Sequence, residues 1–401
     1  MEFLPILLGG DLNAYGMALA FRQLGIYPSV ALGRYRIGVT SHSRIVRQIV
    51  DPRMQCDAGR REMIKKVAEK HPEKRPILIG CTDEYASFLI RERDGFPPHY
   101  IVPSPSVAHS RLADKAVFYE FCKTRGLKTP ATVVLRAGEA VPAVLPFSYP
   151  IVLKPAESET YWHHPFEGMK KVWFPSDSGE ASDVVRRMRQ AGYDGAILLQ
   201  ERLLVEDSDN YVLTVYADRT GRVRGAGFGR VLLEEHTPKG LGNHAAILTE
   251  PMPPIAKRLV AVLEDIGYCG FANFDFLKPK GEDFYILEMN LRQGRSNHYL
   301  TAAGLNPAEL ILEGEEGTER PFFACRPNVF WHSYPTGVVY SQQTDGALLR
   351  RLKELECAGR AVTPWHTGAE SGSLLRWLYV FLHEKRMCAR AARFMEEKEK
   401  I

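Results

Sequence analysis

The sequence predicts an α/β protein that begins with a doubly wound sheet. Residues 3–8 form an apolar, strand-like run, and a turn with two glycines follows it. Residues 16–24 then show helical spacing of apolar residues, and residues 28–32 form a second apolar strand. Residues 77–79 and 86–93 repeat the strand–helix order. The order strand, glycine turn, helix, strand is typical of doubly wound α/β folds.

Glycines and polar residues follow two of these strands, and a further strand is expected at 100–102. The glycine spacing differs from the dinucleotide fingerprint, so a nicotinamide cofactor is not expected. Asp11 and Thr82 could cap the helices that follow them. Alternatively they could bind a ligand, because ligands of doubly wound sheets lie at the carboxyl ends of strands. The candidates at these ends are Gly9, Gly10, Asp11, Thr82, Asp83 and Glu84.

Composition places the chain among ordinary globular proteins. Its 401 residues are 45% hydrophobic and 25% charged, and a prior of about 100–200 residues per domain predicts two to four domains. The net charge of +4 is small for this length and gives no strong case for nucleic-acid binding. The seven cysteines are scattered and include no CxxC pair, which argues against a disulfide framework or a zinc site. Together with the absence of a recognisable signal peptide, they predict a reducing, cytoplasmic location.

Two lysines in the middle of the chain are candidates for binding phosphate. Lys115 lies near the start of a predicted helix at 111–125, which follows a boundary marked by Pro103 and Pro105. Lys154 ends an apolar strand. A lysine that closes an apolar strand supplies a fixed positive charge, although its head group could instead extend into water.

The segment 156–171 is expected to be a flexible lid over a ligand, since it is long and rich in Ser, Thr, His and Lys. The adjacent His163 and His164 are not expected to bind a metal, because neighbouring side chains diverge and no second cluster lies near them. A strand at 172–174 and a helix at 180–191 are expected to follow.

A strand that runs into Gln200 and Glu201 precedes a predicted hairpin over 211–233. The GAGFG sequence of this hairpin lacks the lysine and the strand–loop–helix context of a phosphate loop, so its glycines are interpreted as strand glycines. A helix with apolar residues at core spacing is expected at 253–266.

The stretch 270–295 is predicted to form a hairpin that carries oxygen ligands. Its first strand contains Asp275, and its second ends with Glu288 and Asn290. Residues of matching parity point to one face, so these three side chains could meet. Two carboxylates and an amide oxygen suit a Mg²⁺ ion that also binds phosphates, and Arg292 could hold a phosphate. A half-buried hairpin whose polar residues face water is the alternative.

The composition changes after the acidic run that ends near residue 319. Residues 321–340 are expected to form strands, and residues 345–358 and 373–399 are expected to be helical, as is a short segment at 298–303. The last helix joins an apolar half to a basic half. It could lie on a membrane surface, but packing of its apolar half on the domain body is the favoured interpretation.

The order of these features resembles the ATP-grasp superfamily over residues 1–315. The features are a lysine at a helix start, a lysine at a strand end, a strand that leaves as QERL, an acid near the next turn, and a hairpin with the D…E-x-N-x-R pattern. Within the superfamily the chain resembles the D-aspartate ligases of Gram-positive peptidoglycan synthesis. That likeness lies in PILLGGDLNAYGMALAF, KPAESETYWHHPFEGMKKVWF and FDFL…ILEMNLRQGRSNHYLTAAG.

The resemblance implies an ATP-grasp fold divided into four parts. These are an N-terminal doubly wound α/β domain (1–105), a lid or small subdomain (106–198), a large subdomain with the magnesium site (199–318) and a C-terminal extension (319–401).

The resemblance also implies ATP and Mg²⁺ as cofactors. The lid departs from the glycine-rich pattern of many superfamily members, so its phosphate contacts are open between Ser158, Thr160 and Lys171. The resemblance implies that the nucleotide is bound by Lys115, Lys154, Ser158, Gln200, Glu201, Leu203 and Asp209. It implies that Mg²⁺ is bound by Asp275, Glu288 and Asn290. The transferred phosphoryl group would be bound by Arg292 together with Lys154.

The implied reaction joins the β-carboxylate of D-aspartate to the side-chain amine of a stem lysine or ornithine on a nucleotide-linked peptidoglycan precursor. Arg295 and the 236–244 loop would hold the substrate carboxylate, and Asp11 or Asp83 its amine. The alternatives are an ATP-grasp ligase that joins small amino acids, a non-catalytic nucleotide-binding module, and a scaffold with weak membrane-surface contact. The sequence does not predict the oligomeric state.

Overall fold

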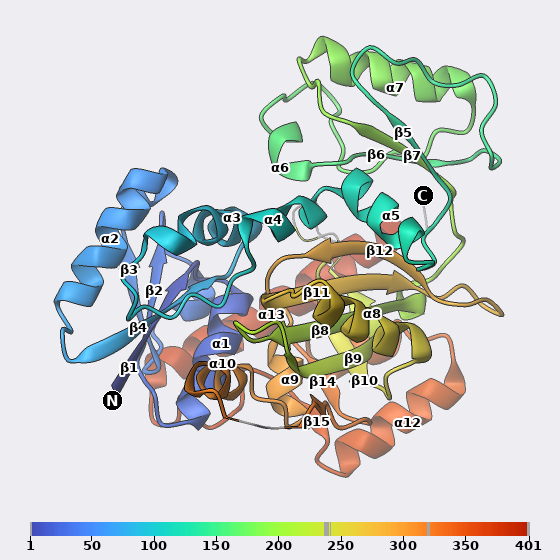
Figure 1. Cartoon of the computed structure of the whole chain (residues 1–401). Coiled ribbons are helices and arrows are strands. Elements are labelled where there is room, and N and C mark those ends of the chain that lie inside the picture. Colours follow the sequence, from blue (N-terminus) through green and yellow to red (C-terminus); the bar gives the residue numbers. More distant parts are fainter. Residues whose placement is uncertain (1, 236–239, 241, 319–320, 399–401) are drawn as a thin grey trace. The chain divides into compact units, whose positions relative to one another are not determined.

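The computed structural model describes residues 2–235, 240, 242–318 and 321–398, without the side chains of 158, 159 and 394–398. The chain forms two compact units (Figure 1). The first contains residues 1–109, 207–273 and 290–401, and the second contains residues 110–206 and 274–289. The four-part division of the chain remains a prediction.

The first unit begins with a parallel sheet of four strands in the order β3-β2-β1-β4. Its central strand β1 is almost entirely buried, because its apolar run lies between helices on both faces. This confirms the predicted doubly wound start. The expected strand at 100–102 is wrong in extent, since Ile101 forms only an isolated bridge with Ile77. The strands are β1 (Glu2–Leu8), β2 (Ser29–Gly33), β3 (Val46–Val50) and β4 (Lys74–Gly80).

Three helices accompany this sheet, namely α1 (Leu12–Gln23), α2 (Asp57–Glu69) and α3 (Asp83–Glu92). Residues Leu12 to Phe21 of α1 are all buried, because the helix also packs against the later helices α9 (His298–Ala302) and α10 (Pro307–Glu316). Helix α1 begins four residues before the predicted start at 16, since Asp11 caps it.

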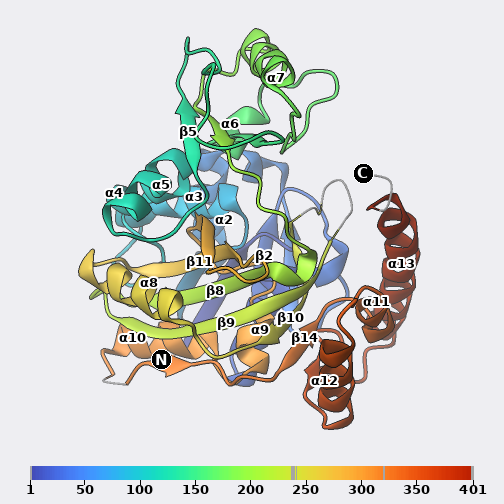
Figure 2. The same cartoon turned by 90° about the vertical axis from the view of Figure 1, so that its right-hand side faces the viewer.

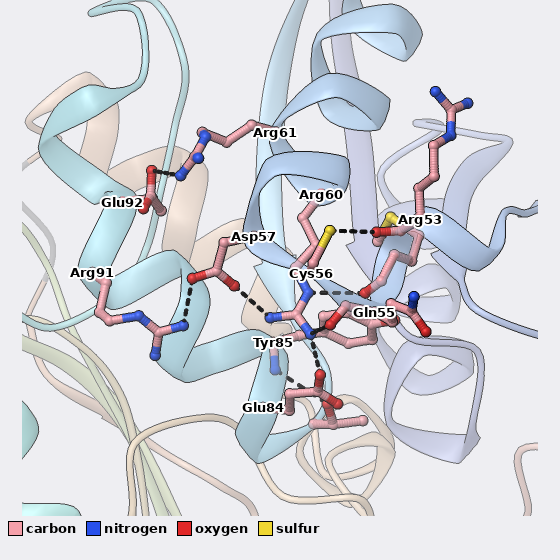
Figure 3. A network of polar contacts seen from close by, with 12 residues as sticks. Arg53, Gln55, Cys56, Asp57, Arg60, Arg61, Glu84, Tyr85, Arg91 and Glu92 are labelled. Carbon is pink, nitrogen blue, oxygen red and sulfur yellow. Dashed lines mark hydrogen bonds and ion pairs between the residues drawn. The ribbon is translucent and has the colours of Figure 1, made fainter.

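A buried arginine joins α2 to α3 and to the chain before α2 (Figure 3). The Arg60 side chain is buried, and its guanidinium donates to Met54 O at 2.9 Å and to Gln55 O at 3.3 Å. It also donates to the carboxylates of Asp57, at 2.8 Å, and of Glu84. Glu84, one of the ligand candidates that follow the strands of this sheet, therefore serves as a partner of this arginine.

The larger sheet of the first unit is built around β9 (Val223–Glu234), which pairs antiparallel with β8 (Asn210–Ala217) and β10 (His244–Thr249). A Cβ at Gly227 of β9 would lie 2.3 Å from the Leu300 side chain. The glycines therefore admit close packing by α9, which confirms that GAGFG consists of strand glycines. The remaining strands of this sheet are β11 (Gly270–Leu277), β12 (Tyr285–Asn290), β13 (Phe323–Ala324), β14 (Phe330–His332) and β15 (Ala361–Val362). Residues 274–289 of β11 and β12 belong to the second unit.

The predicted helices of this unit are present as α8 (Pro254–Asp265), α9, α12 (Gly346–Cys357) and α13 (Leu374–Lys398). The prediction of strands within 321–340 is confirmed only for β13 and β14, and α11 (Thr336–Ser341) forms at the end of this range instead of a strand. Val339 is fully buried, while Val338 and Tyr340 are only partly buried. One face of the helix therefore packs into the hydrophobic core. No helix among the described residues is both long and apolar enough to cross a membrane.

The second unit contains an antiparallel sheet in the order β5-β7-β6. The helix predicted at 111–125 begins at Lys115, because Asp114 caps it after a 3₁₀ turn. The expected strand at 172–174 is wrong in extent, since Trp173 forms only a bridge with Leu153. The elements are α5 (Lys115–Thr124), β5 (Thr132–Leu135), β6 (Val152–Pro155), α6 (Ser158–Tyr161), α7 (Ser178–Gln190), β7 (Ile197–Gln200) and β12 (Tyr285–Asn290).

The segment 156–171 carries α6 and is tied to the unit by an aromatic side chain. Tyr161 is fully buried, and its hydroxyl donates to Lys170 O at 3.0 Å. Its ring packs edge-on against Tyr193. The segment therefore has a fixed anchor at its centre, and its role as a lid remains a prediction.

Candidate active site

Lys115 of α5 and Glu288 of β12 form an ion pair within the second unit. Asp114 accepts hydrogen bonds from the first turn of α5, and this cap places Lys115 at the first helical position. Lys115 Nζ lies 2.9 Å from Glu288 Oε2, and both side chains are largely buried. The Lys115 charge holds the pKa of Glu288 well below its usual range, so the carboxylate is ionised.

Lys154 of β6 lies beside this pair. Burial and the Lys115 charge lower the pKa of Lys154 to about 8, against the opposing influence of Glu288. Lys154 Nζ donates to Tyr119 Oη at 3.3 Å, and that hydroxyl donates to Leu287 O at 2.7 Å. Lys154 is therefore held against α5 and β12 rather than extended into water.

Tyr119 and Lys171 belong to the same group of residues. Tyr119 was not predicted, although it stands four residues after Lys115 and so shares its helix face. Burial raises the pKa of Tyr119, so its hydroxyl stays protonated. The charge of Lys171, a secondary candidate from the sequence, lowers the pKa of both Glu288 and Lys154. The second unit thus gathers three lysines around one carboxylate, which favours the approach of an anion.

The predicted adenine-binding segment leaves the end of β7. Gln200 is buried, and its Nε2 donates to Thr132 Oγ1 at 2.8 Å. Glu201 pairs with Ala131 through two hydrogen bonds, from Glu201 N to Ala131 O at 2.9 Å and from Ala131 N to Glu201 Oε2 at 3.0 Å. Leu203 is half-buried beyond the strand. The segment is therefore fixed at its start by β5.

The predicted magnesium ligands lie on two neighbouring strands. Asp275 is half-buried on β11, while Glu288 and Asn290 occupy alternate positions of β12 and so face the same side of the strand. Two carboxylates and an amide supply the hard oxygen donors that Mg²⁺ takes. No group of three His, Cys, Asp or Glu side chains in metal-binding arrangement occurs among the described residues. The predicted Mg²⁺ ligands include the amide of Asn290 besides two carboxylates, and their role remains a prediction.

In the first unit, Asp11 and Thr82 both cap helices, which confirms the capping alternative for each. Asp11 Oδ1 accepts from Asn13 N at 3.2 Å, and Thr82 Oγ1 accepts from Tyr85 N at 3.3 Å. Asp11 has a further neighbour, since its Oδ2 lies 3.9 Å from Arg295 Nε. Burial raises the pKa of Asp11 although the Arg295 charge opposes it.

Two pairs of predicted residues meet at this edge of the parallel sheet. Asp11 lies beside Arg295, and Asp83 Oδ1 accepts from Arg292 Nε at 2.6 Å. Arg295 Nη1 also donates to Glu235 Oε2 at 2.8 Å. Glu235 was not predicted, and no local pattern could reveal it because its partner is 60 residues away. The edge therefore presents both carboxylates and guanidiniums, which suits a zwitterionic ligand.

Three further candidates from the sequence are Asp209, Thr160 and Ser158. Asp209 ends a 3₁₀ turn before β8 in the first unit. The Thr160 hydroxyl donates to the Glu157 carboxylate. The Ser158 side chain lies outside the described residues, as do 236–239 and 241 of the loop expected to hold the substrate carboxylate. The predicted functional role of each candidate residue is untested by these contacts.

The chain is similar in sequence to known proteins. The chain is 34% identical over 321 residues to a D-aspartate ligase of Enterococcus faecium, covering 78% of this chain and 76% of that enzyme. It is 24% identical over 257 residues to the N-terminal section of the carbamoyl phosphate synthase large chain of Aquifex aeolicus, covering 59% of this chain and 42% of that protein. No protein-family model matches the chain.

Solved structures share the fold at low identity. An L-amino acid ligase of Bacillus licheniformis has a TM-score of 0.52 at 15% identity, over 80% of this chain and 78% of that one. N5-carboxyaminoimidazole synthetase of Staphylococcus aureus, complexed with ADP, has a TM-score of 0.57 at 14% identity over 80% of each chain. The biotin carboxylase domain of 2-oxoglutarate carboxylase of Hydrogenobacter thermophilus, in complex with MgADP, has a TM-score of 0.59 at 14% identity, over 82% and 74%. The fold is therefore the predicted ATP-grasp fold.

Proposed function

Because the chain belongs to the D-aspartate ligase family of ATP-grasp enzymes, we propose that it joins the β-carboxylate of D-aspartate to the side-chain amine of a stem lysine in a peptidoglycan precursor. Membership of the family makes the chain an ATP-dependent ligase of a carboxylate and an amine. The observation that best supports the proposal is the group of lysines around the ionised Glu288, which favours bound phosphates.

The chemistry requires activation, because a carboxylate has no leaving group better than oxide. In the proposed reaction a β-carboxylate oxygen attacks the γ-phosphorus of ATP, and ADP leaves. The acceptor amine then attacks the carbonyl carbon of the acyl phosphate, loses a proton, and expels inorganic phosphate. Phosphoryl transfer of this kind depends on positioning and charge neutralisation rather than on a protein nucleophile.

The residues of the second unit suit the nucleotide. Lys115 and Lys154 would neutralise the phosphates, with a lid residue such as Ser158 as a further contact. Gln200, Glu201 and Leu203 would line the adenine, and Asp209 of the first unit would take the ribose hydroxyls. Mg²⁺ held by Asp275, Glu288 and Asn290 would supply further neutralising charge.

In the first unit, Arg292 would steady the transferred phosphoryl group, and the other charged residues at the edge of the parallel sheet would hold the amino acid. Arg295 would bind the α-carboxylate, and Asp11 or Asp83 would bind the α-amine. Each of these side chains has an opposite charge within the unit, so a zwitterion would exchange partners with an existing ion pair. The exchange leaves no buried charge without a counter-ion.

The acceptor in this proposal is a nucleotide-linked precursor, which places the reaction in the cytoplasm. Residues 319–401 would contribute to binding so large an acceptor.

The proposal is tested by phosphate release from purified protein with ATP, Mg²⁺ and a panel of D- and L-amino acids, with and without a lysine-containing precursor. Release that requires both D-aspartate and the precursor is expected. Release with two small amino acids and no precursor would instead identify a dipeptide ligase. No release under any of these conditions would contradict the ligase reaction.

Two variants test the phosphate site. Glu288→Gln should abolish phosphate release, since it removes the charge that holds Lys115 and the proposed metal ion, whereas Glu282→Gln in the exposed turn of the same hairpin should retain it. Lys154→Ala should weaken ADP binding in calorimetry, with the half-exposed Lys128→Ala as control. Near-normal release by Glu288→Gln, or unchanged affinity in Lys154→Ala, would refute the respective assignment.

A further inference from the structure

The last helix, α13, lies at the surface (Figure 2), and a run of its apolar side chains is exposed to solvent. Other exposed apolar side chains, such as Val144 and Leu204, stand singly along the chain. On α13 they occupy nearly three turns in succession. Their exposed fractions are 77% for Leu374, 63% for Leu375, 61% for Trp377, 45% for Leu378, 41% for Phe381 and 42% for Leu382. The interpretation that the apolar half packs on the domain body is therefore wrong for most of its side chains.

The opposite side of α13 is firmly held, so the exposed face is a fixed feature of the first unit. The guanidinium of Arg376 is buried and donates to Val39 O at 2.6 Å and to Ser41 O at 3.2 Å. Farther along, Met387 and Ala391 join the buried core formed with α11 and α12. These contacts fix the rotation of the helix and direct the apolar face outward.

The exposed face continues from apolar to basic along the helix axis. The Trp377 and Phe381 rings stack with their centroids 5.7 Å apart, and Lys385 Nζ lies 4.5 Å from the Phe381 centroid. These three residues are spaced at i, i+4 and i+8, so they form one ridge. The ridge therefore ends in a cation that lies directly against the aromatic rings.

The turns after the ridge are rich in positive charge. Residues 385–393 contain Lys385, Arg386, Arg390 and Arg393 and no Asp or Glu, and all four basic side chains are exposed. The preceding acid, Glu384, is half-buried and lies 2.9 Å from His366 Nε2. Exposed Trp, Phe and Leu side chains on one face, together with exposed basic side chains on the same helix, are typical of a helix that lies in a lipid interface.

We propose that α13 docks the protein on an anionic lipid surface. The helix lies in the plane of the interface, with Trp377 and its apolar neighbours between headgroups and acyl chains and the basic turns against lipid phosphates. A second copy of the chain fits this face less well. A parallel pair of helices would oppose cations to cations, and a full antiparallel overlap would place cations on apolar side chains. The proposal is independent of the ligase reaction.

The test is flotation of the full-length protein with vesicles of phosphatidylcholine containing about 30% phosphatidylglycerol, compared with pure phosphatidylcholine. Binding is expected to the anionic vesicles and to weaken with added salt. Trp377→Ser combined with Phe381→Ser should weaken partitioning at least roughly tenfold, because two exposed apolar side chains no longer enter the interface. Lys385→Gln combined with Arg386→Gln should weaken it roughly 25-fold, at about fivefold per charge.

Matched substitutions control for surface changes elsewhere. Leu204→Ser removes a side chain of a residue that is 80% exposed outside α13, and Lys65→Gln removes an exposed charge on α2. Both should bind vesicles like the unaltered protein. Every altered side chain is exposed, so the melting temperatures of all the variants should be unchanged.

Three outcomes would overturn the proposal. The first is absence of binding to anionic vesicles, and the second is equal binding by the α13 variants and the unaltered protein. The third is a dimer of the unaltered protein, measured by light scattering during size-exclusion chromatography, together with absence of vesicle binding. This dimer would dissociate in the variant that combines Trp377→Ser with Phe381→Ser. That result would assign the face to self-association.

Discussion

Lys154 lies on β6 beside a second lysine and a single carboxylate. Burial and the Lys115 charge lower the pKa of Lys154, and the charge of Glu288 raises it. The resulting pKa is about 8. Two lysines that share one carboxylate in a partly buried place favour the binding of a further anion. A bound phosphate would in turn favour the protonated amine, so anion binding and protonation of Lys154 are coupled.

This coupling predicts a pH dependence of nucleotide binding. The proton of Lys154 is present below about pH 8 and is lost as the pH rises through that value. Since the phosphates bind the protonated form, affinity for MgADP should be constant near pH 7 and fall by up to about tenfold per pH unit above about pH 8. Calorimetric titrations from about pH 6.5 to about pH 9.5 would measure the profile.

Lys154→Arg should flatten that profile, because a guanidinium keeps its charge over the whole range. Lys128→Arg, whose side chain is half-exposed on the same unit, should keep the profile of the unaltered protein. A fall in affinity of the same size in the Lys154→Arg variant would assign the titration to another group.

At the scale of elements, β9 depends on glycines that face packed side chains. A Cβ at Gly227 would lie 2.3 Å from Leu300 Cδ2 and 2.7 Å from Cys325 Sγ. Both neighbours belong to residues with buried side chains, so neither can withdraw freely. Gly227→Ala should destabilise the fold by about 2 kcal/mol through overpacking, measured as a lower midpoint in urea unfolding.

Gly337 provides the matched control for this substitution. It lies in α11, and a Cβ there would have no atom within 4 Å. Gly337→Ala should leave stability unchanged or raise it by up to about 1 kcal/mol, because alanine suits a helix better than glycine. Equal stability of the Gly227→Ala and unaltered proteins would show that α9 shifts at little cost.

The junction of α2 and α3 depends on Arg60 (Figure 3). Its guanidinium binds two backbone carbonyls and two carboxylates from a buried position. Arg60→Ala should cost about 3 kcal/mol, because buried acceptors lose their donor. Arg91→Ala removes an exposed partner of Asp57 and should cost less than about 1 kcal/mol. Similar unfolding midpoints for the two variants would contradict the difference in burial.

At the scale of the whole molecule, apolar runs were enough to predict most elements. Strands such as β1 and β8 and helices such as α8 were expected close to their observed bounds. The sequence made no prediction for β3 or for α2. Helix α2 is strongly polar, since it carries DAGRREMIKK in its first three turns. The structure buries Met63 and Val67 of that helix against the first sheet, and this packing is invisible to local periodicity.

The candidate site was predicted as a set of residues but not as a set of contacts. Order along the chain singled out Lys115, Lys154 and Glu288, yet the ion pair between residues 115 and 288 follows only from folding. The pair formed by Asp83 and Arg292 spans 209 positions. Glu235 escaped notice for the same reason, since a lone acid after a strand acquires meaning only when Arg295 lies beside it.

The boundary between the two compact units crosses strands β11 and β12, and this affects how the molecule unfolds. Strand β11 continues without a break across the boundary after Asn273, and β12 crosses it after Met289. Each of these strands has residues in both units. If one unit unfolded, the part of the strand in the other unit would expose backbone groups and apolar side chains. We therefore expect these continuous strands to make the whole chain unfold in one step.

Differential scanning calorimetry of the full chain should therefore give a single transition. MgADP, if it binds the lysines of the second unit, should move that whole transition upward, by the equivalent of about 2.7 kcal/mol at about 100 times its dissociation constant. Lys154→Ala should keep the single transition and show a smaller upward shift at the same MgADP concentration. Two resolved transitions, of which only one moves with MgADP, would mean that the shared strands do not couple the units.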